Sequence, residues 1–186
     1  EFLTLPIIKK RLKTQLINNT KIDNSSKFLQ KHLLTIKHSY SKTKFFDKYY
    51  PDIEKIYNKK FTNLIDLNLS FTYFFFKILN IIKSKIIKLS DLNINQRFRK
   101  DNLIYEICSH LKADEYISTV GAEIYMKTNK KLNEDFKIQY FEYCENKDQF
   151  LYYNKKKCHL SIIDLLFNHG DQAKNIIKSN FSIINK

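Results

Sequence analysis

The sequence predicts an α/β fold in which helices flank a parallel sheet, and three observations support this class. Short apolar runs with strand character alternate with segments of helical periodicity, which is the order expected of βαβ units. The chain holds only two glycines, Gly121 and Gly170, and each falls where one such segment passes into the next. A chain of 186 residues, 43% of them hydrophobic, can bury a full core. We therefore expect one α/β domain over residues 1–186.

The first part of the chain is predicted to start with extended segments and to continue as helices. Residues 2–8 and 16–22 have strand character. The polar residues 24–26 are suited to cap a helix, and apolar side chains then recur at helical spacing as far as Ile36. Residues 44–58 repeat the helical pattern, and we expect a new helical turn to begin at Pro51.

The middle of the chain predicts two more helices. Residues 61–79 are the longest apolar stretch, which indicates a buried helix. A short β-branched run follows at 85–89. Residues 100–112 then carry apolar side chains, Cys108 among them, at helical spacing.

The last third of the chain carries the strand–helix–strand signal. A strand is predicted at 115–118, then a turn at Gly121 with a short helix, and a second strand at 137–143. Helices are expected at 161–168 and 171–179, so the chain should have a helical C-terminus.

The two glycines point to special backbone positions. In so glycine-poor a chain, each is expected where φ is positive or where a side chain would clash. Gly170 is typical of a helix stop. Gly121 lies in the segment 118–122, at the carboxyl end of a predicted strand, where α/β sheets bind ligands and free amides meet phosphates or carboxylates. The alternative is a tight turn that simply needs glycine.

The cofactor remains unknown from the sequence, with a nucleotide as the candidate. Neither GxGxxG nor GxxxxGK followed by Ser or Thr is present, so a nucleotide site would be of another type. The three cysteines show no CxxC spacing, which argues against a disulfide framework and a zinc site. His32 and His38 lie six residues apart, on different faces of a helix, so we expect no metal.

The net charge of +14 raises the question of an anionic partner. Arginine occurs only at positions 11, 97 and 99, and lysine lacks the planar fork with which arginine recognises phosphates and bases. The charge is also spread along the chain, apart from residues 155–157. We therefore favour an anionic small-molecule substrate, treat nucleic acid as a lesser alternative, and leave a homodimer open.

The ends and hydropathy of the chain bear on its location. No apolar run approaches the length of about 18 residues that a membrane span requires, and the start lacks the features of a signal peptide. The expected location is the cytoplasm. The first residue is Glu rather than Met and residues 2–8 resemble the middle of a strand, so we expect a native N-terminal segment to precede this sequence.

Two residues are candidates for catalysis. His32 lies beside Leu33 on a predicted helix and could act as an acid or base in a cleft, although a partly buried structural role is the alternative. Asp164 stands in an otherwise apolar helix, where a carboxylate needs a partner, a ligand or access to solvent. The residues expected to bind substrate are Ser118, Gly121, Ala122, Tyr125 and Tyr40.

Several motifs together resemble those of the WbqC-like protein family. The most specific is Leu160-Ser-Ile-Ile-Asp-Leu-Leu-Phe-Asn168, followed by Gly170. Members usually begin with a segment of the kind Gln-Pro-Tyr-Phe-Pro-Tyr, which this sequence lacks. The resemblance also covers 2–6 with Ile22, 31–36 with Tyr40, 46–49, 90–92, and 116–118 with Gly121, Ala122 and Tyr125.

The resemblance implies both a fold and a function. It implies a three-layer Rossmann-like, nucleotidyltransferase-like fold. It also implies a bacterial enzyme of O-antigen or capsule biosynthesis, which transfers an amino-acyl or similar group during modification of a nucleotide-linked sugar. The alternatives are a non-catalytic ligand-binding or scaffold protein of a glycan-synthesis assembly and, below it, a basic nucleic-acid-binding domain. Thr119 stands where members tend to have a second glycine.

Overall fold

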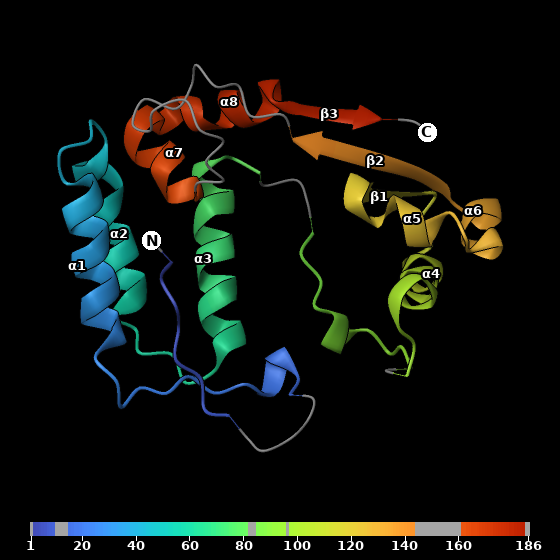
Figure 1. Ribbon diagram of the computed structural model, residues 1–186, viewed down its shortest axis with the longest axis horizontal. Helices are drawn as coiled ribbons and strands as arrows, with labels where there is room; N and C mark the ends of the chain where they lie inside the picture. Colours follow the sequence, from blue (N-terminus) through green and yellow to red (C-terminus); the bar gives the residue numbers. More distant parts are fainter. Residues whose placement is uncertain (1, 10–14, 82–84, 96, 144–160, 185–186) are drawn as a thin grey trace. The chain divides into compact units, whose positions relative to one another are not determined.

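The computed structural model describes residues 2–9, 15–81, 85–95, 97–143 and 161–184, with the side chain of Tyr125 left out. The chain forms two compact units (Figure 1). Unit 1 combines residues 1–84 with 156–174, and unit 2 combines residues 85–155 with 175–186. That these units belong to a single domain stays a prediction.

Unit 1 is built from four helices, and the helical periodicities predicted for this part of the chain are confirmed. Figure 1 shows α1 beside α2. Their bounds are α1 Phe28–Tyr40, α2 Phe46–Tyr57, α3 Leu64–Ile78 and α7 Ile162–His169. The helix α2 continues through Pro51 as one helix instead of restarting there. In α3 only Leu67 is fully buried, so the expected buried helix is partly exposed.

The two strands predicted at the start of the chain do not form. The described residues there make an isolated bridge between Ile7 and Ile22 and a short 3₁₀ helix, Ile17–Asn19. Ile22 donates its amide to Thr62 at 2.9 Å and packs in a cluster with Phe28, Ile56 and Leu67. Ile22 therefore enters the core, and Leu5 packs against the same cluster, without a regular ladder. Phe2, Ile8, Leu16 and Ile17 are exposed, so the strand pattern was a misleading signal here.

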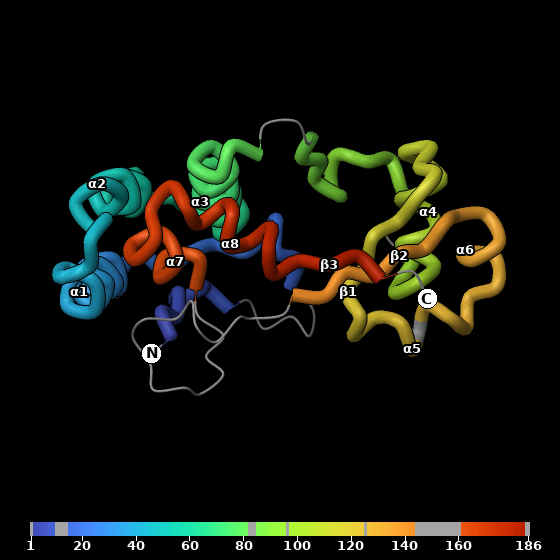
Figure 2. Tube along the Cα trace, turned by 90° about the horizontal axis from the view of Figure 1, so that it is seen from above, coloured from blue at the N-terminus to red at the C-terminus, as the bar shows by residue number. Residues whose placement is uncertain are grey.

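Unit 2 contains the sheet. The strands are β1 Glu115–Thr119, β2 Lys137–Tyr143 and β3 Phe181–Ile184. β1 and β2 are parallel, with Ser118 opposite Tyr140, as the βαβ pattern predicted. β3 lies antiparallel to β2, and Figure 2 shows these two strands side by side. The helical C-terminus predicted from the sequence is therefore wrong for residues 181–184, which form a strand. A mixed α/β class is confirmed, whereas the three-layer Rossmann-like arrangement is not, because the described sheet has three strands and mixed direction.

Helices and turns cover one face of this sheet. Met126 and Leu132 are fully buried against Tyr140, together with Ala122. The run 85–89 forms no strand and leads into a 3₁₀ turn at Leu89–Asp91. The helical elements are α4 Lys100–Leu111, the 3₁₀ turn Val120–Ala122, α5 Glu123–Met126, α6 Lys130–Asp135, and α8 Ala173–Ser179, which leads into β3.

The two glycines differ in backbone conformation and in the space around them. Gly170 has a φ of +56°, and an added Cβ would lie 2.7 Å from the ring of Phe45, so both expectations for this residue are confirmed. Gly121 is not among the residues with positive φ, and a Cβ there would meet nothing within 4 Å. The expectation that Gly121 needs a special conformation is wrong, because a 3₁₀ turn with right-handed residues carries the chain out of β1.

Candidate functional site

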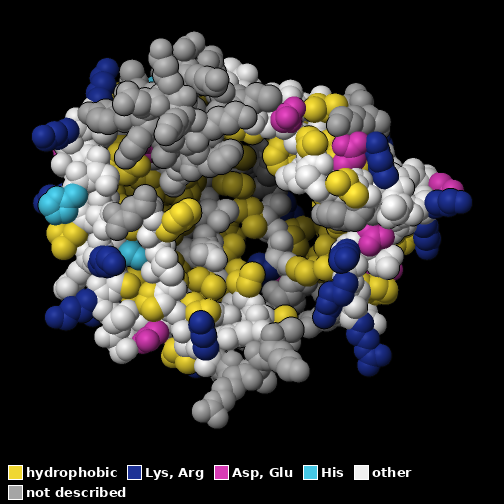
Figure 3. Space-filling view, viewed as in Figure 1, with side chains coloured by type: hydrophobic (Ala, Val, Ile, Leu, Met, Phe, Trp, Pro, Cys, Tyr) yellow, Lys and Arg dark blue, Asp and Glu magenta, His cyan; other side chains and the backbone are white. Residues whose placement is uncertain are grey.

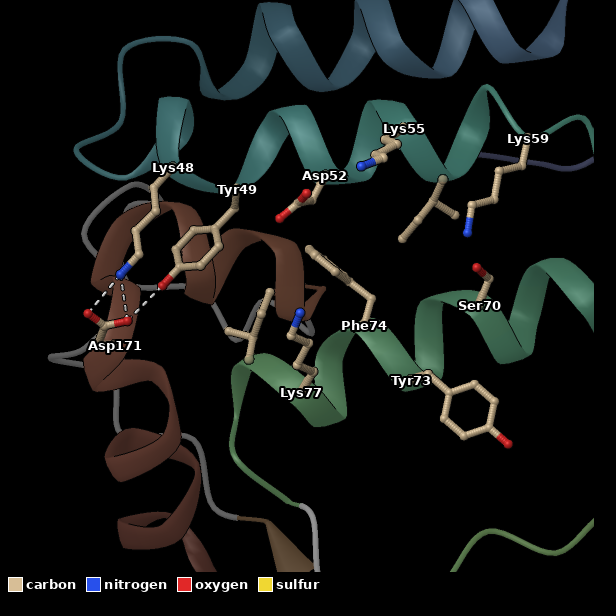
Figure 4. A pocket seen from close by; sticks show the side chains of 12 residues that line it. Lys48, Tyr49, Asp52, Lys55, Lys59, Ser70, Tyr73, Phe74, Lys77 and Asp171 are labelled. Atoms are coloured by element: carbon tan, nitrogen blue, oxygen red, sulfur yellow. Dashed lines mark hydrogen bonds and ion pairs between the residues drawn. The ribbon is translucent and has the colours of Figure 1, made fainter.

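A cleft of about 690 Å³ opens between α2 and α3 in unit 1 (Figure 4). We call it the α2–α3 cleft. Its volume lies in the range of small-molecule sites, about 300–1,000 Å³. It is lined by Lys48, Tyr49, Asp52, Lys55, Ile56, Lys59, Ser70, Tyr73, Phe74, Lys77, Ile78 and Asp171.

The spacing of residues along α2 explains how the cleft is lined. Ile53 and Tyr57 are buried on one side of the helix. Beside them, charged residues recur at intervals of four, three and four, which places them on one adjoining face. They are Lys48, Asp52 and Lys55, with Lys59 just after the end of α2 at Tyr57, and Ser70, Phe74 and Lys77 follow the same spacing on α3. Two helix faces therefore face each other across the cleft.

One end of the cleft is closed by an ion pair. The Lys48 ammonium donates to both carboxylate oxygens of Asp171, at 2.7 and 2.8 Å, and the Tyr49 hydroxyl donates to the same carboxylate at 3.0 Å. Hydrogen bonds from Lys48 and Tyr49 lower the pKa of Asp171, and the bond to Asp171 raises the pKa of Lys48. Both side chains are exposed, so this pair contributes little stability.

The rest of the cleft carries excess positive charge over an apolar floor. Among the described residues, Lys55, Lys59 and Lys77 take part in no ion pair. The cleft has four lysines against two aspartates. In Figure 4 Phe74 supplies apolar surface between these charges, and Ile56 and Ile78 also line the cleft. Such a lining suits an anion that also carries an apolar or ring-shaped part.

His32, one of the two predicted catalytic residues, is in the core of unit 1. Its Nε2 lies 3.1 Å from the carbonyl of Thr4 and its Nδ1 lies 3.3 Å from the Tyr57 hydroxyl. Because a carbonyl only accepts, Nε2 carries the hydrogen and Nδ1 accepts from Tyr57. Burial lowers the pKa of His32 and raises that of Tyr57 to about 12. His32 thus joins three segments as a neutral ring, and its catalytic role stays a prediction.

This burial predicts a pH dependence of stability. Because the folded pKa of His32 lies below its ordinary value of 6.5, the unfolded chain binds a proton between the two values while the folded chain does not. The stabilisation is complete above pH 6.5 and is lost as the pH falls through the folded pKa. We expect the melting temperature of the wild type to fall more between about pH 7.5 and 5.5 than that of His32→Gln.

The matched control for this measurement is His38→Gln, because His38 is exposed on the same helix. It should keep the pH dependence of the wild type. If the melting temperatures of His32→Gln and the wild type fell equally with pH, the proposed link between the protonation of His32 and stability would be contradicted.

Asp164 and Tyr40, predicted separately as a catalytic and a substrate-binding residue, come together in unit 1. Asp164 is 6% exposed in the first turn of α7. Its pKa is raised by burial, and hydrogen bonds from Asn168 and Tyr40 and the charge of His169 act in the opposite direction. The Asn168 amide lies 3.2 and 3.3 Å from the two carboxylate oxygens. These residues form a buried polar cluster that is not part of the cleft lining.

The other predicted ligand-binding residues lie in unit 2, at the carboxyl end of β1. Ser118 is buried within β1 and Ala122 is buried in the turn that follows this strand, whereas Gly121 is exposed. The side chain of Tyr125 lies outside the described part of the structure. The structure therefore places these residues and the α2–α3 cleft in different units, and their role in binding stays a prediction.

A family comparison decides the identity of the chain. The sequence model of the WbqC-like protein family matches residues 1–176. The chain belongs to the WbqC-like protein family. Comparisons with curated proteins and with solved structures gave no match.

In this WbqC-like protein residues 162–168 of the most specific motif form most of α7, which leads to one end of the cleft. The Phe45 amide donates to the Phe167 carbonyl at 3.0 Å. The Phe167 ring packs against Tyr40 and Phe46, with centroids 5.2 and 5.3 Å apart. Gly170 then brings the chain close to the Phe45 ring, and the next residue, Asp171, reaches Lys48. The motif therefore fixes α2, and the residue that follows it supplies a side chain of the cleft.

Sequence reasoning missed the lysines of the cleft. Their helical spacing on α2 was visible, but a charged helix face is usually a solvated one. Nothing in the sequence shows that α3 faces these lysines.

Within the described ranges, no group of three His, Cys, Asp or Glu side chains is placed to hold a metal ion. No helix in those ranges has the length and apolar character needed to cross a membrane. Cys108 is buried, and Cys144 and Cys158 lie outside the described residues.

Proposed function

We propose that this WbqC-like protein is an enzyme of bacterial O-antigen or capsule biosynthesis. Its reaction is the transfer of an amino-acyl or similar group during modification of a nucleotide-linked sugar. Membership of the family supports the biological setting. The observation that carries the substrate class is the α2–α3 cleft, in which Lys55, Lys59 and Lys77 make no ion pair with any described residue and apolar side chains complete the lining.

A nucleotide-linked sugar matches the cleft in charge and composition. Its diphosphate is anionic, and the base and sugar are rings with apolar faces. Lys55 and Lys77 come from opposite helices, and Phe74 lies between the two helices (Figure 4). Ammonium groups bind phosphates as point charges, and the ring surface supplies packing.

The proposed chemistry is acyl transfer to an amine of the sugar. The amine nitrogen attacks the carbonyl carbon of an activated acyl donor such as a thioester. The new C–N bond forms, the bond to the thiolate leaving group breaks, and the amine proton passes to a base. Asp52 is the candidate base because it lines the cleft and takes part in no ion pair among the described residues. His32 and Asp164 remain candidates on the sequence argument.

The test uses a UDP-linked amino sugar with acetyl-coenzyme A or an aminoacyl thioester, with mass spectrometry of the sugar product. We expect product with the wild type. Asp52→Asn should still bind the UDP-sugar but lose about 10²–10⁴-fold in rate, the usual contribution of a general base. If Asp52→Asn keeps the wild-type rate, the matched variants Asp164→Asn and His32→Gln test whether one of these two residues is the base.

Other outcomes select the alternatives. UDP-sugar binding without any product would favour the non-catalytic ligand-binding protein. Binding only to a short DNA duplex, lost at moderate salt, would favour the nucleic-acid-binding reading. Figure 3 shows Lys and Arg side chains at several separate places among the described residues of the visible face.

A further inference from the structure

We propose that Lys55, Lys59 and Lys77 bind the diphosphate of a nucleoside diphosphate, while the Lys48–Asp171 pair closes the cleft beyond it. The inference deepens the proposed function and rests on it for the location of the ligand. It assigns a role to each lysine of the α2–α3 cleft. It adds to the proposed function the residues that hold the diphosphate.

The first argument is the availability of the ammonium groups. Lys48 already donates to both oxygens of Asp171. Lys55, Lys59 and Lys77 have no carboxylate within ion-pair distance among the described residues. Three positive groups held around one cleft repel each other, and an anion between them removes that repulsion.

The second argument is that these groups come from both walls. In Figure 4 the ammonium of Lys59, which follows the C-terminal end of α2, and the hydroxyl of Ser70, from α3, point toward each other. Lys55 and Lys77 also point into the space between the helices. A single phosphate is small compared with a cleft of about 690 Å³, whereas a nucleoside diphosphate fills more of this volume. Ser70 adds a neutral donor to one phosphate.

The third argument concerns the ring. Phe74 projects from α3 toward α2 and lies among the lysines in Figure 4. Ile56 and Ile78 also line the cleft. Inorganic phosphate has no apolar part that could pack against this surface. The same surface can pack against the base or sugar of a nucleotide, as aromatic side chains do in ligand sites. The ligand class whose phosphates match the lysines and whose ring matches the apolar side chains is therefore a nucleoside diphosphate.

The experiment is isothermal titration calorimetry of the full chain with UDP, uridine and inorganic pyrophosphate. UDP should bind most tightly, pyrophosphate more weakly and uridine not measurably. Each of Lys55→Gln, Lys59→Gln and Lys77→Gln should weaken UDP binding about tenfold, as expected for the loss of one charge-assisted hydrogen bond. Lys37→Gln is the matched control, because Lys37 is exposed on α1 and does not line the cleft. It should bind UDP as the wild type does.

Two results would overturn the inference. One is uridine binding as tightly as UDP, and the other is unchanged UDP affinity in the double variant Lys55→Gln/Lys59→Gln with an unchanged melting temperature. Failure here is distinct from failure of the proposed function. Acyl transfer with lysine-independent binding would refute the diphosphate site alone, whereas lysine-dependent UDP binding without transfer would refute the reaction alone.

Discussion

Replacing Phe167 by alanine is expected to lower the free energy of unfolding by about 3–5 kcal/mol, the range for removing a fully buried phenylalanine. Phe167 is 0% exposed, and its ring contacts those of Tyr40 and Phe46. The substitution therefore leaves a cavity where α1, α2 and α7 meet. Since domains are stable by about 5–15 kcal/mol, this loss takes a large share of the total. Urea denaturation followed by far-UV circular dichroism measures it.

The control is Leu34→Ala, because Leu34 lies on α1 with 56% of its surface exposed. Its effect should stay within about 0.5 kcal/mol. Equal losses for the two variants would contradict the position assigned to Phe167.

The second large effect is expected at Gly170. In Gly170→Ala the new Cβ would lie 2.7 Å from the Phe45 ring, and the backbone has a φ of +56° with a ψ of −127°. Backbone strain of this kind costs about 1–3 kcal/mol, and forcing an atom into a packed site costs a similar amount. We expect a total loss of about 2–4 kcal/mol in unfolding free energy, measured in the same denaturation experiment.

Gly121→Ala provides the matched comparison at the other glycine. Its backbone does not require positive φ, and the space around it is open within 4 Å. The substitution should be neutral or stabilising by about 0.4–1 kcal/mol, because alanine restricts the unfolded chain. A loss at Gly121 as large as that at Gly170 would show that the assigned backbone conformations are wrong.

Local patterns were sufficient to predict the long elements of this fold. The helix over 100–112 and the strand over 137–143 appear within a residue or two of the structure, because their apolar spacing reports directly on burial. The strand Phe181–Ile184 was missed because a four-residue element depends on its partner, here β2. The apolar pattern at 2–8 predicted a strand that does not form: Leu5 packs against the core of unit 1 from an irregular segment, whereas Phe2 and Ile8 are exposed.

The site was less accessible to sequence reasoning than the fold. The polar partners of Asp164 were partly foreseeable, because a carboxylate in an apolar helix must find donors, and Tyr40 and Asn168 supply them. The α2–α3 cleft was not foreseeable. Its lysines become a site only where α3 brings Phe74 and Lys77 opposite them, and that juxtaposition is a property of tertiary packing.

The division of unit 1 between two stretches of sequence has a consequence for synthesis on the ribosome. The residues that complete the aromatic cluster around Phe167 follow residues 85–155, which belong to unit 2. At about 5–20 residues per second, translation of that stretch delays α7 by roughly 4–14 s after α3 has been made. For that interval the nascent helices lack the segment that fixes α2, so they are exposed to chaperones. A fragment ending at residue 84 would keep this unfinished state permanently.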